Sequence, residues 1–250
     1  MCGRFELHTN PAAIALAFGL AYPPDLQPRY NVAPTQMIPV VRHNANGERE
    51  LVQVRWGFVP RWAKDPSIGA RMINARAETV ESKPAFRNAF QRHRCLVPAD
   101  GFYEWRQGPG GKQPMRIARA DGQPFGMAGL YERWRSPDGE VLDTCTILTT
   151  HANAQLAGVH ERMPVIVPPE QYERWLDAAN VEVAELFTPR TDVDLLVHPV
   201  STRVNAVRND DAALIEAIAD TPRARAAEPV PVDADDEEPT PELPLQERLF

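Results

Sequence analysis

The chain has 250 residues, a hydrophobic content of 43% and a formal net charge of −7. This length allows one domain with a good core, alone or with an appendage, and no apolar run approaches the ~18 residues of a membrane-spanning helix. Three cysteines without CxxC spacing argue against a disulfide framework or a zinc site, so we expect a cytoplasmic protein, without a secretion signal, that holds no metal.

The charge is unevenly distributed along the chain. Residues 221–250 hold eight acidic and three basic residues, whereas residues 1–120 hold 17 Lys or Arg against 9 Asp or Glu. Most of those bases are Arg, the side chain suited to forked phosphate contacts. A basic N-terminal half is typical of a nucleic-acid-binding surface. The alternative is a solvated surface that the acidic second half balances.

Short helices and strands are expected throughout the first 220 residues. Asn10-Pro11 is a cap residue followed by proline, which predicts a helix to Phe18. Strands at 36–42 and 51–58 flank a turn and predict a hairpin. Further helices are predicted at 84–92, 169–178 and 210–219, and further strands at 95–98, 102–105, 115–118, 125–131, 144–150 and 195–200.

The first residues carry an unusual chemical possibility. Removal of Met1 would leave Cys2 with a free α-amine beside its thiol. With reference pKa values of ~7.7–8.0 and ~8.5, both groups are partly nucleophilic near neutrality. Such a pair condenses with an aldehyde to a thiazolidine ring. It can also act as an N-terminal nucleophile in hydrolysis, and the simplest alternative is a buried small residue.

Two further side chains are candidates for proton transfer. Glu104 lies between two aromatic residues in a predicted strand, so it faces either solvent or a cleft, and burial in a cleft would raise its pKa. His160 precedes Pro164 in a predicted loop, where functional groups concentrate. A structural histidine and an exposed strand glutamate are the alternatives. No P-loop or dinucleotide-binding motif is present, so no cofactor is expected.

Aromatic, Arg and amide residues alternate at residues 56–62 and 73–78, a pattern that suits stacking on unpaired bases and phosphate contacts. An aromatic residue in such a loop can equally fill the core. The composition changes after residue 220: residues 221–250 hold six prolines and eight acidic residues with few large apolar ones, which predicts a disordered tail, 221–250, behind a domain at 1–220. It ends in Leu249-Phe250, which suggests either a docking peptide or a frayed terminus.

Several sequence blocks, in order and at compatible spacings, resemble the SOS-response-associated peptidase family. These blocks are Met1–Phe5, Asn31–Thr35, Trp56-Gly57 with Pro60 and Trp62, Asn74–Glu78, Arg94–Trp105, Thr149–Asn153, His160–Pro164 and Val200–Asn205. The resemblance implies a single α+β domain with a strongly curved, barrel-like antiparallel β-sheet flanked by short helices. It also implies activity on single-stranded DNA that contains abasic sites.

The resemblance assigns roles to individual residues. Cys2 would form the crosslink, Asn74 would position the N-terminal residue, Glu104 would manage protons and His160 would assist ring opening and carbinolamine chemistry. Phosphate contacts would come from Arg4, Arg76 and Arg162, and Trp62 would act as a wedge or stacking platform. The expected partner is abasic single-stranded DNA, bound by a monomer that associates with the nucleoid when on DNA.

The expected function is therefore covalent capture of an abasic site as a thiazolidine on Cys2, which shields the strand during the DNA damage response. Loss of Met1 would be autoproteolytic or the work of a separate enzyme, and a lyase-like activity is a further expectation. The alternatives are an N-terminal-nucleophile peptidase or amidase and a DNA-binding scaffold without covalent chemistry. Gln246, Leu249 and Phe250 also resemble the bacterial sliding-clamp-binding peptide, which suggests that the tail recruits the domain to replication forks.

Overall fold

The computed structural model describes residues 2–108, 110–180, 182–189 and 193–219. The strands are β1 (Phe5–Leu7), β2 (Arg29–Val32), β3 (Met37–His43), β4 (Arg49–Trp56), β5 (Asn74–Arg76), β6 (Arg94–Ala99), β7 (Gly101–Gly108), β8 (Gly111–Arg119), β9 (Phe125–Arg135), β10 (Val141–His151), β11 (Arg162–Pro164), β12 (Ile166–Val167) and β13 (Leu195–Pro199). The α-helices are α1 (Pro11–Phe18), α2 (Arg87–Arg92) and α3 (Tyr172–Leu176). Short 3-10 helices are η1 (Pro66–Arg71), η2 (Ala77–Thr79), η3 (Pro169–Gln171), η4 (Ala184–Phe187), η5 (Thr202–Asn205) and η6 (Ala212–Ile215).

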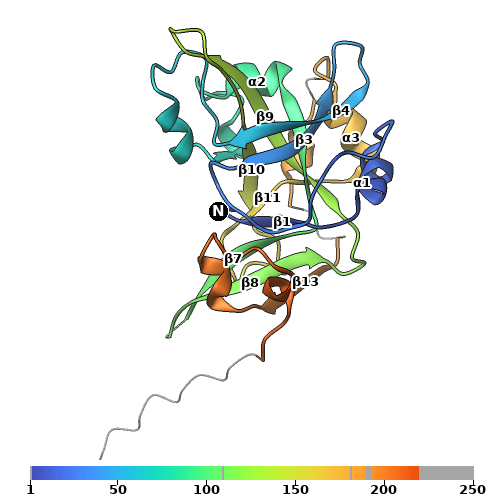
Figure 1. The fold of residues 1–250 in the computed structure, drawn as a ribbon, viewed down its shortest axis with the longest axis vertical. Helices are drawn as coiled ribbons and strands as arrows, with labels where there is room; N and C mark the ends of the chain where they lie inside the picture. Colours follow the sequence, from blue (N-terminus) through green and yellow to red (C-terminus); the bar gives the residue numbers. More distant parts are fainter. Residues whose placement is uncertain (1, 109, 181, 190–192, 220–250) are drawn as a thin grey trace, which may run out of the picture. The chain divides into compact units, whose positions relative to one another are not determined.

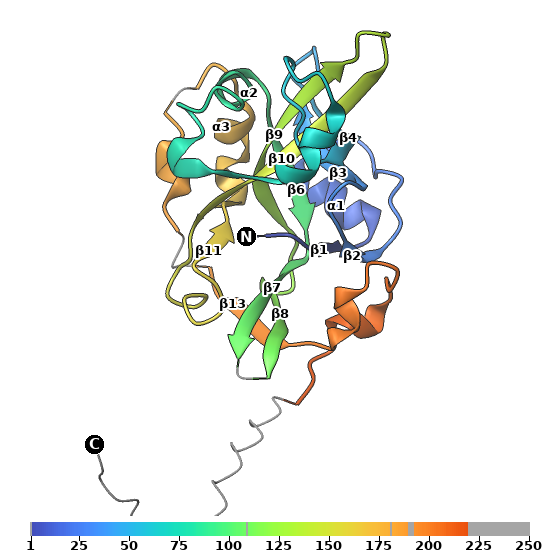
Figure 2. The same ribbon diagram turned by 90° about the vertical axis from the view of Figure 1, so that its left-hand side faces the viewer.

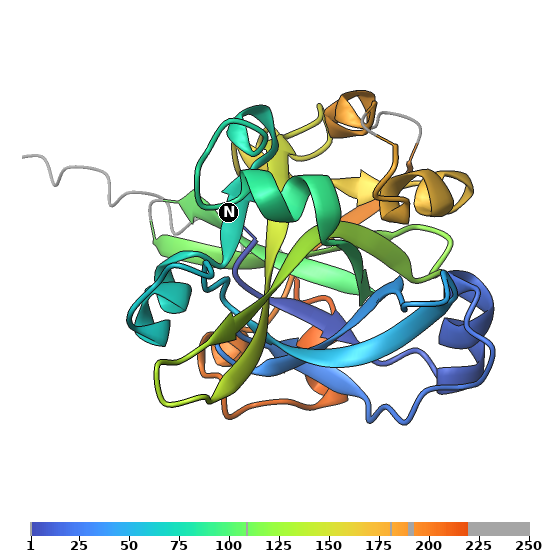
Figure 3. The same ribbon diagram turned by 90° about the horizontal axis from the view of Figure 1, so that it is seen from above.

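A closed barrel forms the first part of the fold. Strands pair in the order β10-β4-β3-β6-β9, and β9 pairs with β10 again to close the ring. Strands β5, β11 and β12 are added to its edges. Figure 3 shows this arrangement from above, with the short helices around and over the strands. The expected curved, barrel-like sheet with few short helices is confirmed, although β10 pairs with β4 and β5 in parallel rather than antiparallel.

A second sheet joins the barrel through a common core. Its strand order is β13-β8-β7-β1-β2, and in Figure 1 its strands β7, β8 and β13 lie below the barrel strands. Phe5 of β1 packs edge-on against Trp56 of the barrel at 5.4 Å between ring centroids. Phe102 and Phe125 make a similar contact across the two sheets. Because these aromatic residues are almost fully buried, the two sheets share one hydrophobic core.

The predicted hairpin at 36–58 is found as β3 and β4, and the helix after Asn10 is found as α1. The Asn10 side chain accepts a hydrogen bond from Ala13 N, and Gly19 ends the helix with φ 65°.

The predictions of helices at 169–178 and 210–219 are wrong in extent. The first is divided into η3 and α3, and the second is reduced to the single turn η6. After that turn, Ile218 N donates to Pro199 O and Ala217 bridges Val200, so the backbone hydrogen bonds go to the neighbouring chain segment instead of a helix.

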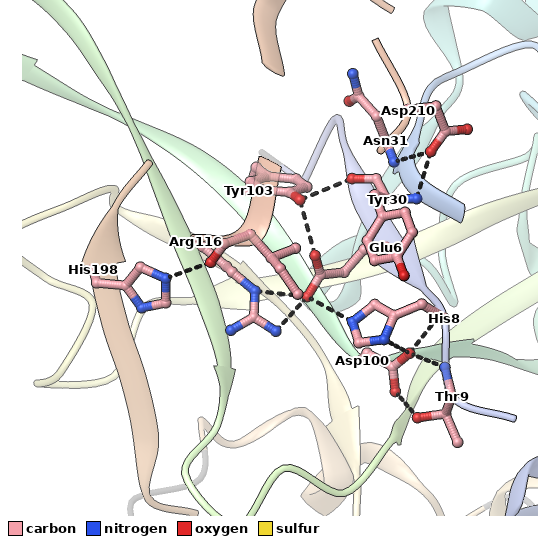
Figure 4. A network of polar contacts seen from close by, with 11 residues as sticks. Glu6, His8, Thr9, Tyr30, Asn31, Asp100, Tyr103, Arg116, His198 and Asp210 are labelled. Carbon is pink, nitrogen blue, oxygen red and sulfur yellow. Dashed lines mark hydrogen bonds and ion pairs between the residues drawn. The ribbon is translucent and has the colours of Figure 1, made fainter. Parts of the chain in front are cut away.

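The N-terminal strand β1 is held by a buried carboxylate. Glu6 is fully buried, its Oε1 accepts a hydrogen bond from Arg116 Nε at 2.7 Å, and its Oε2 accepts one from Tyr103 Oη at 2.9 Å. Figure 4 shows this group together with His8. A Cβ atom at Gly101, which pairs with Glu6, would come within 2.6 Å of the carboxylate. The absence of a side chain there leaves room for the ion pair that ties β1 to β7 and β8.

The charges around Glu6 oppose the effect of its burial. Burial would raise the pKa of Glu6, but the nearby His8 imidazole, whose Nε2 lies 3.8 Å from Glu6 Oε1, and the charge and hydrogen bond of Arg116 outweigh it and lower the pKa below its usual value. A carboxyl whose pKa is depressed stabilises the fold above its unfolded pKa and loses that contribution as the pH falls through the folded value. The ion pair therefore stabilises the protein at neutral pH.

We expect Glu6→Gln to lower the free energy of unfolding by about 3–5 kcal/mol at pH 7, because it leaves the Arg116 charge buried without its partner. Urea denaturation followed by circular dichroism measures this, and the difference from wild type should shrink below pH ~4, where Glu6 itself becomes protonated. The control is Asp143→Asn, which breaks the more exposed pair with Arg133 and should cost no more than about 1 kcal/mol. Equal costs for the two variants would contradict the anchoring role of Glu6.

Two expectations lie partly or wholly outside the described residues. The tail, 221–250, and its terminal residues Gln246, Leu249 and Phe250 are not described, so the predicted clamp-binding peptide stays a prediction. Within the described part of the chain, no helix combines the length and apolar character that crossing a bilayer requires.

Candidate active site

Cys2 lies inside the molecule at the start of the segment that leads into β1. Its side chain is fully buried, and Asn74 of β5 donates a hydrogen bond from Nδ2 to the Cys2 carbonyl oxygen at 2.7 Å. Asn74 is itself held in register because β5 pairs in parallel with β10, where Asn74 is opposite Ile147. The predicted association of Cys2 with Asn74 is present in the structure.

A cleft of about 590 Å³ is lined by Glu104, whose charge acts on Cys2, whereas Cys2 and Asn74 are not among its lining residues. Glu104 and Trp105 on β7 and Lys112 on β8 line one part of it. The remaining lining residues come from β5, β11 and the loop before β11, and they are Arg76, His160, Glu161 and Arg162. The structure thus brings together Glu104 and His160, which are 56 residues apart in the sequence, within one concave site.

The titratable groups of Cys2 and Glu104 influence each other. Burial raises the pKa of the Cys2 thiol, the negative charge of Glu104 raises it further, and the backbone N–H of Arg4 acts in the opposite direction. Burial also raises the pKa of Glu104, whose side chain is almost inaccessible, while the charge of His160 lowers it. In the chain that still carries Met1, these surroundings disfavour the thiolate. The expectation of a partly ionised thiol concerns the chain without Met1 and stays a prediction.

The hydrogen bonding of His160 determines which ring nitrogen can exchange protons. Its Nδ1 accepts a hydrogen bond from the backbone N–H of Arg162 at 2.9 Å. In the neutral ring, the proton must then be on Nε2. The backbone of the loop therefore fixes the tautomer and leaves Nε2 as the atom for proton transfer.

The four predicted DNA-contacting residues lie in different environments. Arg76 is exposed and lines the cleft. Arg162 also lines it, but its guanidinium donates twice to Glu78, at 2.7 and 2.9 Å, and once to Thr149 O. Arg4 donates to Asn31 Oδ1 and to Val204 O. Trp62 is 64% exposed but is not among the residues that line the cleft.

These contacts make Arg76 the best placed of the predicted cations to meet a phosphate. Arg162 and Arg4 are engaged within the protein, which favours a positioning role for both. Sequence reasoning missed Trp105 and Lys112 as site residues. The signal for Trp105 was present, since it directly follows Glu104 in a strand, whereas Lys112 reaches the cleft only through the pairing of β7 with β8.

Comparison with known proteins identifies the family. A family model described as SOS response associated peptidase (SRAP) matches residues 1–207. The chain belongs to the SRAP family. The resemblance of the sequence blocks is thereby confirmed, and every residue that lines the cleft falls within the SRAP match.

Several relatives of this SRAP chain have descriptive names. It is 42% identical over 223 residues to the abasic site processing protein YoqW of Bacillus subtilis, an alignment that covers 86% of this chain and 99% of that protein. It is 32% identical over 234 residues to the abasic site processing protein YedK of Escherichia coli, covering 87% and 100% of the two chains. A crystal structure of a protein from Bacteroides thetaiotaomicron matches with a TM-score of 0.77 and 26% identity, covering 87% of this chain and all of that chain.

We expect Glu104→Gln to stabilise the fold at neutral pH. A carboxyl with a raised pKa costs stability as the pH rises from its unfolded pKa of ~4.3 to its folded pKa, by about 1.4 kcal/mol for each pH unit between the two. Urea denaturation at pH 4 and pH 7 should show that the free energy of unfolding of the variant, relative to that of wild type, is higher at pH 7 than at pH 4. Glu140→Gln changes an exposed carboxylate and should stay within about 0.5 kcal/mol of wild type. A Glu104→Gln variant without such a gain would contradict the buried, proton-retaining site.

Proposed function

We propose that this chain captures abasic sites in single-stranded DNA by forming a thiazolidine between the sugar aldehyde and Cys2, after Met1 has been removed. The observation that carries the proposal is the fixed position of Cys2, held through its carbonyl by Asn74 next to a buried carboxylate at the cleft. The names of the SRAP relatives support the substrate, since they describe abasic site processing proteins.

The first step needs an open-chain aldehyde and a neutral amine. An abasic deoxyribose is mostly a closed hemiacetal. His160 Nε2 gives its proton to the ring oxygen as the bond from that oxygen to C1′ breaks, and it takes the proton of the C1′ hydroxyl, so the C1′ carbonyl forms and the imidazole stays neutral. The α-amine of Cys2 then attacks C1′ to give a carbinolamine. Glu104 takes a proton from the nitrogen and returns it to the departing hydroxyl, so that water leaves and an imine remains.

The amine bonds to C1′ before the sulfur does, because the ring closes onto the carbon of the imine. The Cys2 thiol is buried near Glu104, which can accept its proton as the sulfur attacks. The sulfur then bonds to the imine carbon as the thiol proton passes to Glu104, and the imine nitrogen gains a proton to become the secondary amine of the five-membered ring.

The remaining cleft residues suit a single DNA strand. Arg76 and Lys112, which line the same cleft as Glu104, provide positive charge for phosphates, and the half-buried Trp105 indole offers a surface for stacking a base. A missing base leaves a gap, so the sugar reaches the cleft without the few kcal/mol normally needed to unstack a base. Of the other predicted DNA-contacting residues, Trp62 stays a proposed stacking residue. Arg4 and Arg162 are proposed to position the site, because their guanidinium groups donate hydrogen bonds within the protein.

Removal of Met1 belongs to the same proposal. We propose autoproteolysis, with a separate aminopeptidase as the alternative, and a lyase-like activity at the opened sugar as an accompanying reaction. A peptidase or amidase that uses Cys2 as its nucleophile is the competing function. The proposed contact of Gln246, Leu249 and Phe250 with a sliding clamp is independent of the chemistry, and a Leu249→Ala, Phe250→Ala variant that binds the clamp as well as wild type would disprove it.

The test is to mix Cys2→Ser with an abasic single-stranded oligonucleotide and analyse it on a denaturing gel. Wild type should give a heat-stable shifted band, whereas the serine hydroxyl closes a much less stable ring and should give none. Cys95→Ala, which removes a thiol buried in β6, should retain the band. A tetrahydrofuran analogue, which has no aldehyde, should give no band with any variant.

A hydrolase would behave differently in this experiment. A serine at position 2 can still act as a hydrolytic nucleophile, and a peptidase would ignore the DNA. A shifted band of equal strength with Cys2→Ser would therefore contradict the thiazolidine, and the absence of any band with wild type would contradict the proposed function itself.

A further inference from the structure

Residues 201–210, called the clasp below, lie along the second sheet on the face opposite to Phe5. The clasp contains η5, and in Figures 1 and 2 it belongs to the orange segment beside β7 and β8. Val204 of the clasp is fully buried and packs with Tyr103, and the partly buried Tyr30 and Trp105 border the same apolar cluster. The clasp therefore covers the side of β7 that carries the aromatic neighbours of Glu104.

Hydrogen bonds to Asn31 of β2 hold the clasp in one conformation. Asn31 is fully buried, and its Nδ2 group lies within 3.2 Å of the carbonyl oxygens of Val204 and Ala206 and 2.6 Å from that of Asn209. The Asp210 carboxylate in turn accepts hydrogen bonds from the backbone N–H groups of Tyr30 and Asn31, as Figure 4 shows. Such a satisfied network gives the clasp little freedom to move.

The clasp contacts Trp105, a side chain that lines the cleft. Asn205 Oδ1 accepts a hydrogen bond from Trp105 Nε1 at 2.8 Å. The Arg4 guanidinium lies 5.9 Å from the centre of the indole, while its Nη1 donates to Val204 O at 2.6 Å. The indole is thus fixed at its polar edge by Asn205 and at its face by a cation that the clasp also holds.

We propose that Asn205 is a positioning residue that sets the Trp105 indole as the stacking surface for the nucleobase next to the abasic sugar. The inference rests on the proposed function. Without the hydrogen bond, a half-buried tryptophan on a hairpin populates several rotamers, and the DNA must select one of them when it binds. The hydrogen bond to Asn205 holds the indole in one rotamer before the DNA binds. The alternative role for Asn205 is simply to close the turn of η5.

The experiment compares Asn205→Ala with wild type on two oligonucleotides. One carries normal bases on both sides of the abasic site, and the other has tetrahydrofuran residues in those neighbouring positions. On the first oligonucleotide, Asn205→Ala should raise the DNA concentration for half-maximal crosslinking rate about threefold to tenfold and leave the maximal rate unchanged. This loss of affinity is smaller than the loss of a whole base–aromatic stack, because the indole is still present. On the second, the variant and wild type should agree. Thr202→Ala, an exposed change in the same turn, is the matched control and should behave as wild type on both.

Trp105→Phe tests the route through the hydrogen bond. It keeps a stacking ring but has no N–H for Asn205, so adding Asn205→Ala to it should cause no further change. An equal effect of Asn205→Ala on both oligonucleotides, or an undiminished effect in the Trp105→Phe background, would assign Asn205 a purely structural role and overturn the proposal. No effect on either oligonucleotide would also overturn it.

A measurement without DNA separates this inference from the proposed function. Acrylamide should quench tryptophan fluorescence more strongly in Asn205→Ala than in wild type, and this difference should vanish in the Trp105→Phe background. If wild type forms no crosslink, the proposed function fails while the quenching result still decides the position of Trp105. Unchanged quenching would refute the positioning role even when crosslinking is normal.

Discussion

The ion pair between Glu6 and Arg116 is the interaction on which the site depends. A chain terminus ordinarily frays, because few contacts hold its first residues. Here β1 is inserted between β2 and β7, and the Glu6 carboxylate ties it to side chains of β7 and β8. Only three residues lie between Cys2 and Glu6. The buried anchor therefore determines where the sulfur lies relative to Glu104 and Asn74.

The electrostatic environment of the site disfavours negative charge. Burial raises the pKa of both Cys2 and Glu104, and each group would make ionisation of the other more costly. Such a pair suits a reaction in which protons are passed between neighbouring groups in turn. It suits less well a hydrolase that relies on a ready thiolate. The same reasoning explains why a stabilising change at Glu104 would remove a functional group, a common conflict between stability and activity.

The sequence predicted the family and the meeting of Glu104 and His160 better than it predicted their surroundings. The blocks around Cys2, Asn74, Glu104 and His160 predicted the family, and the alternation of residues in β7 correctly allowed Glu104 to face a cleft. The partners of the arginines were not predictable, because Glu78 is 84 residues from Arg162 and Val204 is 200 residues from Arg4. Helix lengths failed near 171 and 216 for a similar reason, since tertiary hydrogen bonds replaced helical ones. The role inferred for Asn205 likewise depends on a contact across 100 residues.

The most direct test of the central claim is mass spectrometry of the purified crosslink. Imine formation releases one water and closure of the ring releases nothing, so the adduct should weigh the protein without Met1 plus the abasic strand minus one water. Peptide mapping should place the modification on the N-terminal Cys2. Retention of Met1 in the crosslinked protein, or an adduct located on another side chain, would contradict the account.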